Sequence, residues 1–214
     1  MRSILVFAPH NDDEIIGVGG TIKKHITNGD IVTICELTSG ERYKTLQSEA
    51  KKAHSLMGVK DTIFLNLPVG ELRNQKQAEI NHRLVEVINS VQPEVAYIPF
   101  VGDMHLDHRE TVESAMVGLR PIHCKTIKEI YSYETLSETG WNIPQSDKAF
   151  VPNVWVDITN TFKDKIEAMC CYKSQICEFP HPRSIEAIEA LAKYRGSTIG
   201  AQYAECFMLV RLIK

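Results

Sequence analysis

The sequence predicts an α/β fold with a largely parallel sheet, and three observations support this. Residues 4–7 form an apolar run without alternation, which is typical of a strand covered on both faces. Strand-like and helix-like segments then alternate along the chain, the order that produces parallel sheets. The 214 residues, 43% of them hydrophobic, are enough for one sizeable core, so we expect a single domain, 1–214.

The first half of the chain supplies the centre of this sheet. Apolar residues recur three or four positions apart in the helical segments, for example at Ile80, Leu84 and Val87, and helix stops follow at Gly29 and Gly58. The expected elements, in order, are a helix at 14–28, a strand at 31–37, a helix at 44–57, a strand at 62–65, a helix at 77–91, a strand at 95–98 and a helix at 109–119.

The second half has less regular signals. A long loop is expected at 136–152, and loops of that length are often functional. The glycines at 17–20 do not form a dinucleotide-binding fingerprint, because acidic residues occupy the first turn after the strand, and close helix packing explains them better. The remaining expected elements are strands at 129–133, 154–157 and 206–213 and helices at 162–172 and 185–195.

One histidine and three acids follow the first strand: His10, Asp12, Asp13 and Glu14. The carboxyl end of a strand is where open α/β sheets bind ligands. Neighbouring carboxylates repel one another unless a cation, a partner or a proton relieves them, so we expect a metal here. Taken alone, the segment also fits a helix N-terminus with acids favoured by the helix dipole, and Glu14 suits either interpretation.

A second polar cluster follows the strand at 95–98 and contains His105, Asp107 and His108. Because the carboxyl ends of parallel strands meet at one edge, this cluster is expected to face the first. A catalytic zinc takes three protein ligands plus a water, and His10, Asp13 and His108 can supply the three. Iron(II) or cobalt(II) would accept the same ligand types.

The other polar side chains suit catalytic roles around such a metal. Asp12 is not used as a ligand and could act as a general base. His105 could stabilise the oxyanion of a tetrahedral intermediate and protonate a leaving amine. Asp107 could orient one of its neighbouring histidines. Together these residues predict metal-assisted hydrolysis of an amide-like bond.

Charge and composition exclude several kinds of partner. A net charge of −3 without a basic run argues against nucleic acid or a membrane surface and favours a small-molecule substrate. The apolar run in the N-terminal segment is too short for a signal peptide or a spanning helix, so we expect a cytoplasmic protein. The six cysteines lack a paired C-x-x-C pattern and are expected to be reduced thiols.

Six motifs are spread over nearly the whole chain: APHNDDE at 8–14, TSGE at 38–41, a helix with EA at 49–50 that ends in MGV at 57–59, HLDH at 105–108, YKSQ at 172–175 and YAECF at 203–207. This set resembles the LmbE-like or PIG-L family of zinc-dependent N-deacetylases. The resemblance implies a Rossmann-like three-layer fold with a largely parallel sheet. It also implies hydrolysis of an N-acetyl group on an amino sugar, such as a glucosaminyl conjugate, and a symmetric homo-oligomer.

The roles implied by the resemblance agree with those inferred from the residues. By resemblance, zinc is bound by His10, Asp13 and His108, Asp12 is the general base, and His105 is the oxyanion stabiliser. Two positions depart from the family pattern. Asn11 stands where the family usually has proline, and Leu46 stands near the position where it often has a substrate-contacting arginine. The candidate substrate contacts are therefore Arg42, Lys44, His181 and Arg183.

Two alternatives to the deacetylase remain. A non-haem iron(II) oxygenase also uses two histidines and one carboxylate, although the alternating strands and helices argue against the β-rich folds usual for it. A metal-binding but inactive module is the other, and Asp12 and His105 argue against it because mere binding does not need them. Surface or boundary positions are expected for the remaining histidines without a nearby acid cluster: His25, His54, His82 and His123.

Overall fold

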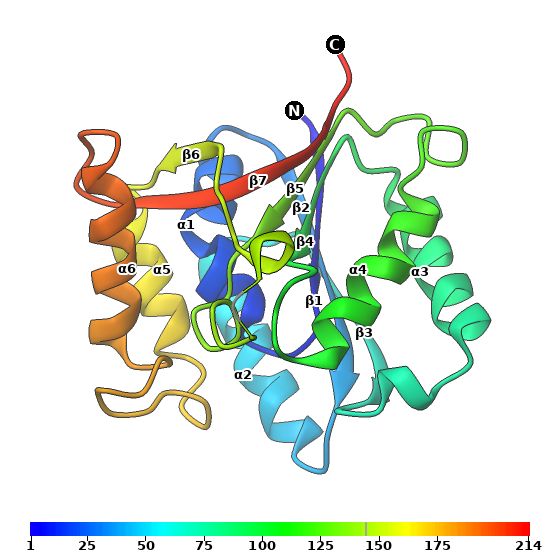
Figure 1. Cartoon of the computed structure of the whole chain (residues 1–214), viewed down its shortest axis with the longest axis horizontal. Coiled ribbons are helices and arrows are strands. Elements are labelled where there is room, and N and C mark those ends of the chain that lie inside the picture. Colours follow the sequence, from blue (N-terminus) through cyan, green and yellow to red (C-terminus); the bar gives the residue numbers. More distant parts are fainter. Residues whose placement is uncertain (144) are drawn as a thin grey trace.

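A computed structural model of the chain, which describes residues 1–143 and 145–214, is a three-layer α/β arrangement (Figure 1). Within these residues the middle layer is a seven-stranded sheet in the order β3-β2-β1-β4-β5-β7-β6. Strands β1 to β5 are parallel, and β7 runs antiparallel to both of its neighbours. The strands are β1 (Ser3–Ala8), β2 (Ile31–Ser39), β3 (Asp61–Pro68), β4 (Val95–Pro99), β5 (Glu129–Tyr133), β6 (Val154–Asp157) and β7 (Ala204–Leu212).

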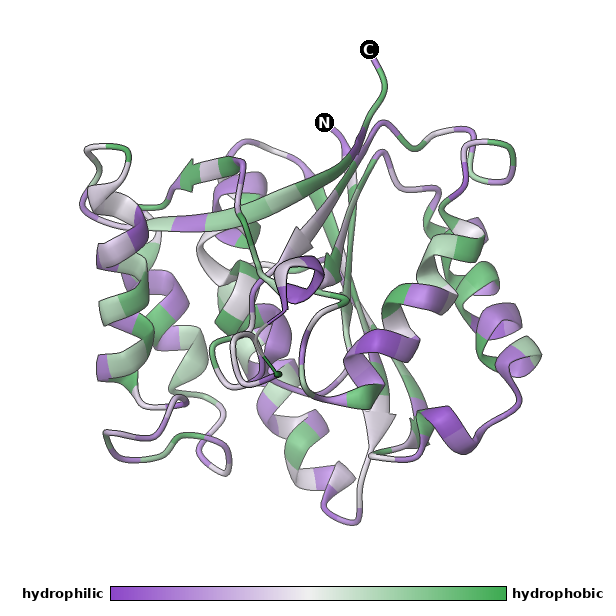
Figure 2. Cartoon of the chain, viewed as in Figure 1, coloured by the Kyte–Doolittle hydropathy of each residue, from purple (hydrophilic) through white to green (hydrophobic). Residues whose placement is uncertain are grey.

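Helices cover both faces of the sheet. One face packs against α1, α2, α5 and α6, and the other against α3 and α4 (Figure 1). The helices carry both hydrophobic and hydrophilic bands, as expected for elements buried on one side (Figure 2). They are α1 (Asp13–Thr27), α2 (Tyr43–Met57), α3 (Gln77–Val91), α4 (Leu106–Gly118), α5 (Phe162–Met169) and α6 (Ile185–Ser197), with 3₁₀ turns at Leu72–Asn74 and Ser146–Lys148.

Strand β1 explains the absence of alternation in its sequence. Ile4 and Val6 belong to the core on the α1 face, whereas Leu5 and Phe7 belong to the core on the α3 face. Both sides of the strand are therefore apolar, as expected for a central parallel strand. The α/β fold class predicted from the sequence is confirmed.

Every element expected from the sequence is present, with shifts at some ends. Helix α4 begins at Leu106 rather than 109, because the side chain of His105 accepts a hydrogen bond from the Asp107 N–H and caps the helix. Helix α5 ends at Met169, and Tyr172 lies in the turns that follow. In the loop expected at 136–152, Pro144 lies outside the described residues.

The glycines of α1 allow this helix to pack closely against β5 and against the residue that follows β6. A Cβ atom at Gly20 would lie 2.7 to 2.8 Å from three side-chain atoms of Ile158, and one at Gly17 would meet the ring of Tyr133. The packing interpretation of residues 17–20 is therefore confirmed. Among the described residues, the structure contains no helix that is long and apolar enough to cross a membrane.

Candidate metal centre and catalytic cavity

The turn between β1 and α1 brings a carboxylate and an imidazole together. Asp13 Oδ2 accepts a hydrogen bond from the backbone N–H of His10 at 2.9 Å and lies 3.1 Å from His10 Nδ1. The same oxygen lies 3.2 Å from Nε2 of His108, which is in the first turn of α4. Two strand ends thus place three potential ligand groups, His10, Asp13 and His108, with one ligand atom of each within 4.8 Å of the others.

Each of the two imidazoles is held by a buried carboxylate on its other ring nitrogen. His108 Nδ1 lies 2.8 Å from Asp103 Oδ2, and His10 Nε2 lies 3.2 Å from Asp107 Oδ2. Asp107 is itself fixed by the backbone N–H groups of Gly70 and Leu72, at 2.7 and 3.2 Å. This arrangement leaves His10 Nδ1 and His108 Nε2 facing Asp13, as in metal sites whose histidines are oriented by carboxylates.

The expected partner of Asp107 was one of its neighbouring histidines, and the structure pairs it with His10 instead. The distance from Asp107 Oδ2 to His105 Nδ1 is 3.9 Å, beyond hydrogen-bonding range. His105 interacts with the backbone of Asp107, whose N–H donates to His105 Nδ1 at 3.1 Å. Sequence proximity therefore suggested the wrong partner, because the first turn of a helix separates the directions of adjacent side chains.

The charges of the site fit a divalent cation. Burial opposes ionisation of Asp13, but His108 and His10 outweigh it and hold the pKa of Asp13 well below its usual range. Burial opposes protonation of the imidazoles, yet Asp107 and Asp13 raise the pKa of His10 to about 9, and Asp13 and Asp103 raise that of His108 to about 10. Among the described residues, no contact of the buried His108 Nε2 has hydrogen-bond geometry, although Asp13 Oδ2 lies 3.2 Å away. A cation there would replace the protons that these carboxylates favour.

Asp12 lies beside this group without a comparable set of partners. Its side chain is buried, and its Oδ2 has no hydrogen-bond partner among the described residues. Burial and the charge of Asp13 raise the pKa of Asp12 well above its usual value, and Arg183, whose Nη1 lies 3.8 Å from Asp12 Oδ2, opposes this rise. Asp12 is therefore a carboxylate whose affinity for a proton is enhanced.

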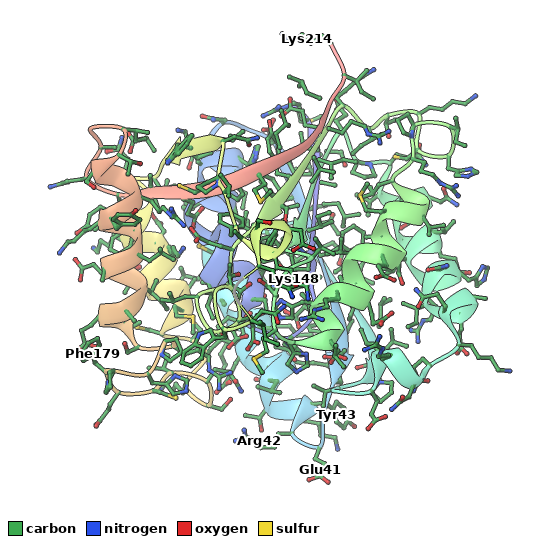
Figure 3. All side chains as sticks on the ribbon, viewed as in Figure 1. Glu41, Arg42, Tyr43, Lys148, Phe179 and Lys214 are labelled. Carbon is green, nitrogen blue, oxygen red and sulfur yellow. The ribbon has the colours of Figure 1, made fainter. Side chains whose placement is uncertain are left out.

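A cavity of about 600 Å³ lies over these residues at the carboxyl ends of β1 and β2. Its lining includes His10, Asp12, Asp13 and His105, together with two of the four candidate substrate contacts, Arg42 and Arg183. Figure 3 shows Glu41, Arg42 and Tyr43 near one another at the lower edge of the view.

The other two candidate substrate contacts do not line this cavity. Lys44 is exposed and contributes to a separate hollow along α2, with its Nζ 5.9 Å from the centre of the Tyr43 ring. His181 Nδ1 accepts a hydrogen bond from the backbone N–H of Arg183 at 3.1 Å and so supports the segment that carries Arg183.

Comparison with known proteins decides the family. The model of the family described as "PIG-L: GlcNAc-PI de-N-acetylase" matches residues 5–118, just over half of the chain. The chain belongs to the PIG-L family. The matched region contains the three potential metal ligands, Asp12 and His105.

Named relatives of this PIG-L family protein include deacetylases. The diacetylchitobiose deacetylase of Thermococcus kodakarensis is 25% identical, over 96% of the chain and 82% of the relative. The structure of the N,N'-diacetylchitobiose deacetylase of Pyrococcus horikoshii is similar with a TM-score of 0.79 and 26% identity, covering 97% of this chain and 83% of that one. The 4-carboxy-2-hydroxymuconate hydratase of Pseudomonas putida KT2440 also has a TM-score of 0.79, at 22% identity over 100% and 99% of the chains, which shows the shared fold alone.

Several residues of the site in this PIG-L family protein carried no assigned role in the sequence analysis. Asp103 is one, although its position five residues before His108 is a signal for a carboxylate that orients a ligand histidine. Gln175 is another: it lines the cavity, and its Oε1 accepts a hydrogen bond from Arg183 Nη1 at 3.1 Å. Ser137 and Glu138 line the cavity from the loop after β5.

The expected surface or boundary position was wrong for two histidines. His54 is only 2% exposed, and its Nε2 lies 3.0 Å from Glu14 Oε1 and 3.7 Å from Glu36 Oε1. His25 is 8% exposed and contacts Asp30 and Tyr97. The acids that face His54 come from other elements, so no acid cluster is visible in the sequence around it.

Proposed function

We propose that the chain is a metal-dependent hydrolase that removes an N-acetyl group, or a related N-acyl group, from an amino sugar or similar small amine conjugate. Residues 1–214 would form one catalytic unit. The observation that carries it is the geometry around Asp13, where two imidazoles and a carboxylate converge beside a buried carboxylate, Asp12, that has its own access to the cavity. The deacetylase relatives support the reaction class.

His10, Asp13 and His108 would hold the metal. Their two imidazole nitrogens and one carboxylate suit zinc, and iron(II) or cobalt(II) also accept this ligand set. A bound divalent metal supplies a Lewis acid that polarises a carbonyl group and makes water a stronger nucleophile at neutral pH. Asp103 and Asp107 keep the two imidazoles in the required orientation.

Asp12 would act as the general base. Burial and the neighbouring Asp13 raise its pKa, which strengthens it as a proton acceptor, and Arg183 keeps a positive charge close to its carboxylate. In the proposed reaction Asp12 takes a proton from the attacking water. The hydroxyl of that water adds to the acyl carbon, the C–N bond breaks, and the products are a carboxylic acid such as acetate and the free amine.

His105 would serve as oxyanion stabiliser and general acid. Its Nδ1 accepts the backbone hydrogen of Asp107, so even the neutral imidazole carries its own hydrogen on Nε2. His105 lines the cavity, where this N–H can donate a hydrogen bond to an oxyanion. As general acid the ring must be the imidazolium, with a proton on Nδ1 in place of the hydrogen bond from Asp107; it then gives one proton to the leaving amine and returns to the neutral form. Burial and the nearby His10 lower the pKa of His105, so its imidazolium form gives up a proton more readily.

The substrate class follows from the polarity of the cavity. Arg42, Glu41, Glu138, Gln175 and Arg183 line it, and these groups can hydrogen-bond the hydroxyls of a sugar. The two diacetylchitobiose deacetylases at 25% and 26% identity support an N-acetylated amino sugar as the first substrate to test.

The test is release of amine and acetate from a panel of N-acetylated amino sugars, using protein of measured metal content. We expect release that a chelator abolishes and that the added metal restores. Asp12→Asn should lose turnover and keep its metal, whereas His108→Ala should lose the metal itself. Full activity of Asp12→Asn would refute the general base.

The same measurement separates the alternatives. No amine from any substrate, by protein that holds one metal per chain, would favour a non-catalytic binding module. Oxygen consumption with a 2-oxoacid and no amine release would favour an iron(II) oxygenase.

A further inference from the structure

The backbone at Asp12 has an unusual conformation for a residue with a side chain. Its φ is 126° and its ψ is −24°. Among the described residues, the other non-glycine residues with positive φ are Asn66 and Gln92, and both are exposed. Asp12 is buried at the reacting end of the cavity. A conformation of this kind persists only where surrounding contacts fix it, and it sets the direction of the carboxylate.

Contacts on both sides of Asp12 fix this conformation. The carbonyl of Asp12 accepts hydrogen bonds from the N–H groups of Ile15 and Ile16, at 3.1 and 2.9 Å, as the start of α1. The N–H of Asp12 donates to Glu14 Oε2 at 3.2 Å. The first contact is ordinary helix geometry. The second depends on one side chain, Glu14, which is fully buried.

Glu14 is held in turn by two elements that are distant in sequence. Its Oε1 accepts hydrogen bonds from the Tyr172 hydroxyl at 2.5 Å and from His54 Nε2 at 3.0 Å. His54 Nδ1 lies 2.8 Å from Thr62 Oγ1 in β3, which leaves Nε2 as the nitrogen that faces Glu14. An acid that is present only because the helix dipole favours it can remain in solvent, where water hydrogen-bonds its carboxylate, and needs no such buried partners.

We propose that Glu14 is a positioning residue, locked by Tyr172 and His54, that fixes the backbone of Asp12 and thereby aims its carboxylate at the reacting water. This inference rests on the proposed role of Asp12 as general base. It assigns a function in turnover to Glu14, Tyr172 and His54.

A cation is the competing explanation for this cluster. Glu14, Glu36 and His54 offer ligand atoms within 4.8 Å of one another, and both oxygens of Glu36 are buried without a hydrogen-bond partner among the described residues. However, Glu14 Oε1 is already occupied by two donors. Burial and the charge of Glu14 raise the pKa of Glu36 well above its usual value, which disfavours the charged carboxylate that a cation would need. Counting metals tests this alternative directly.

The experiment compares Tyr172→Phe, Glu14→Gln and Glu14→Ala with the native chain. We expect kcat to fall about 10- to 100-fold in Tyr172→Phe and Glu14→Ala, with KM changed by less than about three-fold. Glu14→Gln should retain more activity than Glu14→Ala, because its amide oxygen can still accept the Asp12 N–H. Each variant should bind as much metal as the native chain.

Tyr97→Phe is the matched control. It removes another buried hydroxyl that contacts a histidine, His25 Nε2 at 2.9 Å, away from the cavity. We expect its kcat to equal that of the native chain. An equal fall in Tyr97→Phe and Tyr172→Phe would mean a general loss of packing and would overturn the positioning role.

Three further outcomes would overturn the proposal: unchanged kcat in folded Tyr172→Phe and Glu14→Ala, loss of the catalytic metal in these variants, or a second metal that disappears in Glu36→Gln. Crystal structures of the native chain and Glu14→Gln or Glu14→Ala give a readout that does not need turnover. If the native chain shows no deacetylase activity, the proposed function fails by itself. The positioning role is then supported if the φ of Asp12 changes from 126° when Glu14 is replaced, and it is refuted if the φ stays the same.

Discussion

Asp103 is a buried carboxylate whose effect passes through a neighbouring imidazole. It contacts Nδ1 of His108 and is itself fully buried. Burial raises the pKa of Asp103, and the contact with His108 acts against this rise, so the pair depends on both partners remaining in place. Carboxylates of this kind fix the tautomer and ring orientation of a histidine that binds metal.

Replacing Asp103 with asparagine should weaken metal binding. The amide cannot hold the His108 tautomer as a carboxylate does, and we expect a loss of about 10- to 100-fold in metal affinity. Competition with a chromophoric chelator measures this directly. Asp147→Asn, an exposed site, is the matched control. Equal affinities for Asp103→Asn and the native chain would show that Asp103 does not support the ligand.

The cysteines should differ sharply in reactivity. All six are free, as the sequence indicated. Cys206 is buried, and burial raises its pKa to about 12, whereas Cys170 is exposed. Because the thiolate is the nucleophile, iodoacetamide at mildly alkaline pH should modify Cys170 first and leave Cys206 unmodified in the folded protein. Peptide mapping by mass spectrometry checks the order, and early modification of Cys206 would contradict the burial seen here.

At the scale of elements, helix α1 connects the site to the core. It begins at the acidic turn and continues through glycines that pack against the loop after β6 and against β5. Lys165 of α5 donates to the carbonyl of Ile16, and Glu205 of β7 accepts from the N–H groups of Gly20 and Thr21. The position of the acidic turn therefore depends on how closely α1 lies against its neighbours.

Gly20→Ala should destabilise the protein. Alanine is the better helix former by about 1 kcal/mol, but its Cβ would overlap Ile158, and overpacking costs roughly 1–3 kcal/mol. We expect a lower midpoint of urea unfolding. Thr27→Ala, at the exposed end of the same helix, should change stability by less than about 0.5 kcal/mol. A Gly20→Ala variant more stable than the native chain would contradict this prediction and would mean that α1 can shift away from Ile158 at little cost.

The elements were predictable from the sequence because their signals are local. Apolar spacing and glycine or proline stops identify β1 and α1 to β4, and parallel topology predicts that His10 and His108 meet at one edge. Directions of side chains within a helix turn were not predictable, which is why Asp107 was assigned to the wrong histidine and Lys44 was grouped with Arg42.

The predictions from the sequence failed mainly where a residue contacts an element that is distant in the chain. His54 has no acid close to it in sequence, yet Glu14 and Glu36 face it from α1 and β2. The number of possible partners for one buried histidine is large, and only the packing of α2 on the sheet selects among them. An alternating pattern predicts which face is buried and leaves the partner on that face undetermined.

At the scale of the whole molecule, stability should depend on pH through His25, which joins α1 to Asp30 and Tyr97. Burial lowers the pKa of His25 below its ordinary value of 6.5, so below that pH the unfolded chain binds a proton that the native chain resists. This contribution is complete above about pH 6.5 and is lost as the pH falls towards the native pKa, at up to about 1.4 kcal/mol per pH unit.

Urea unfolding at pH 7.5 and pH 5.5 measures this effect. The native chain should lose more stability between the two pH values than His25→Gln does. His82→Gln, at an exposed position, should behave as the native chain. Equal losses in all three proteins would show that His25 is not protonated on unfolding in this range.

The hydrogen bond between Glu14 and Tyr172 spans 158 residues of sequence. During synthesis, therefore, the acidic turn and both candidate histidine ligands leave the ribosome long before the tyrosine that completes their surroundings. A nascent chain ending shortly after α4 contains every candidate metal ligand, yet Glu14 Oε1 still lacks one of its two donors. Folding of this region must wait for a contact of long sequence separation, which is slow to form. Metal captured earlier would bind a chain whose proposed general base, Asp12, is not yet fixed by this contact.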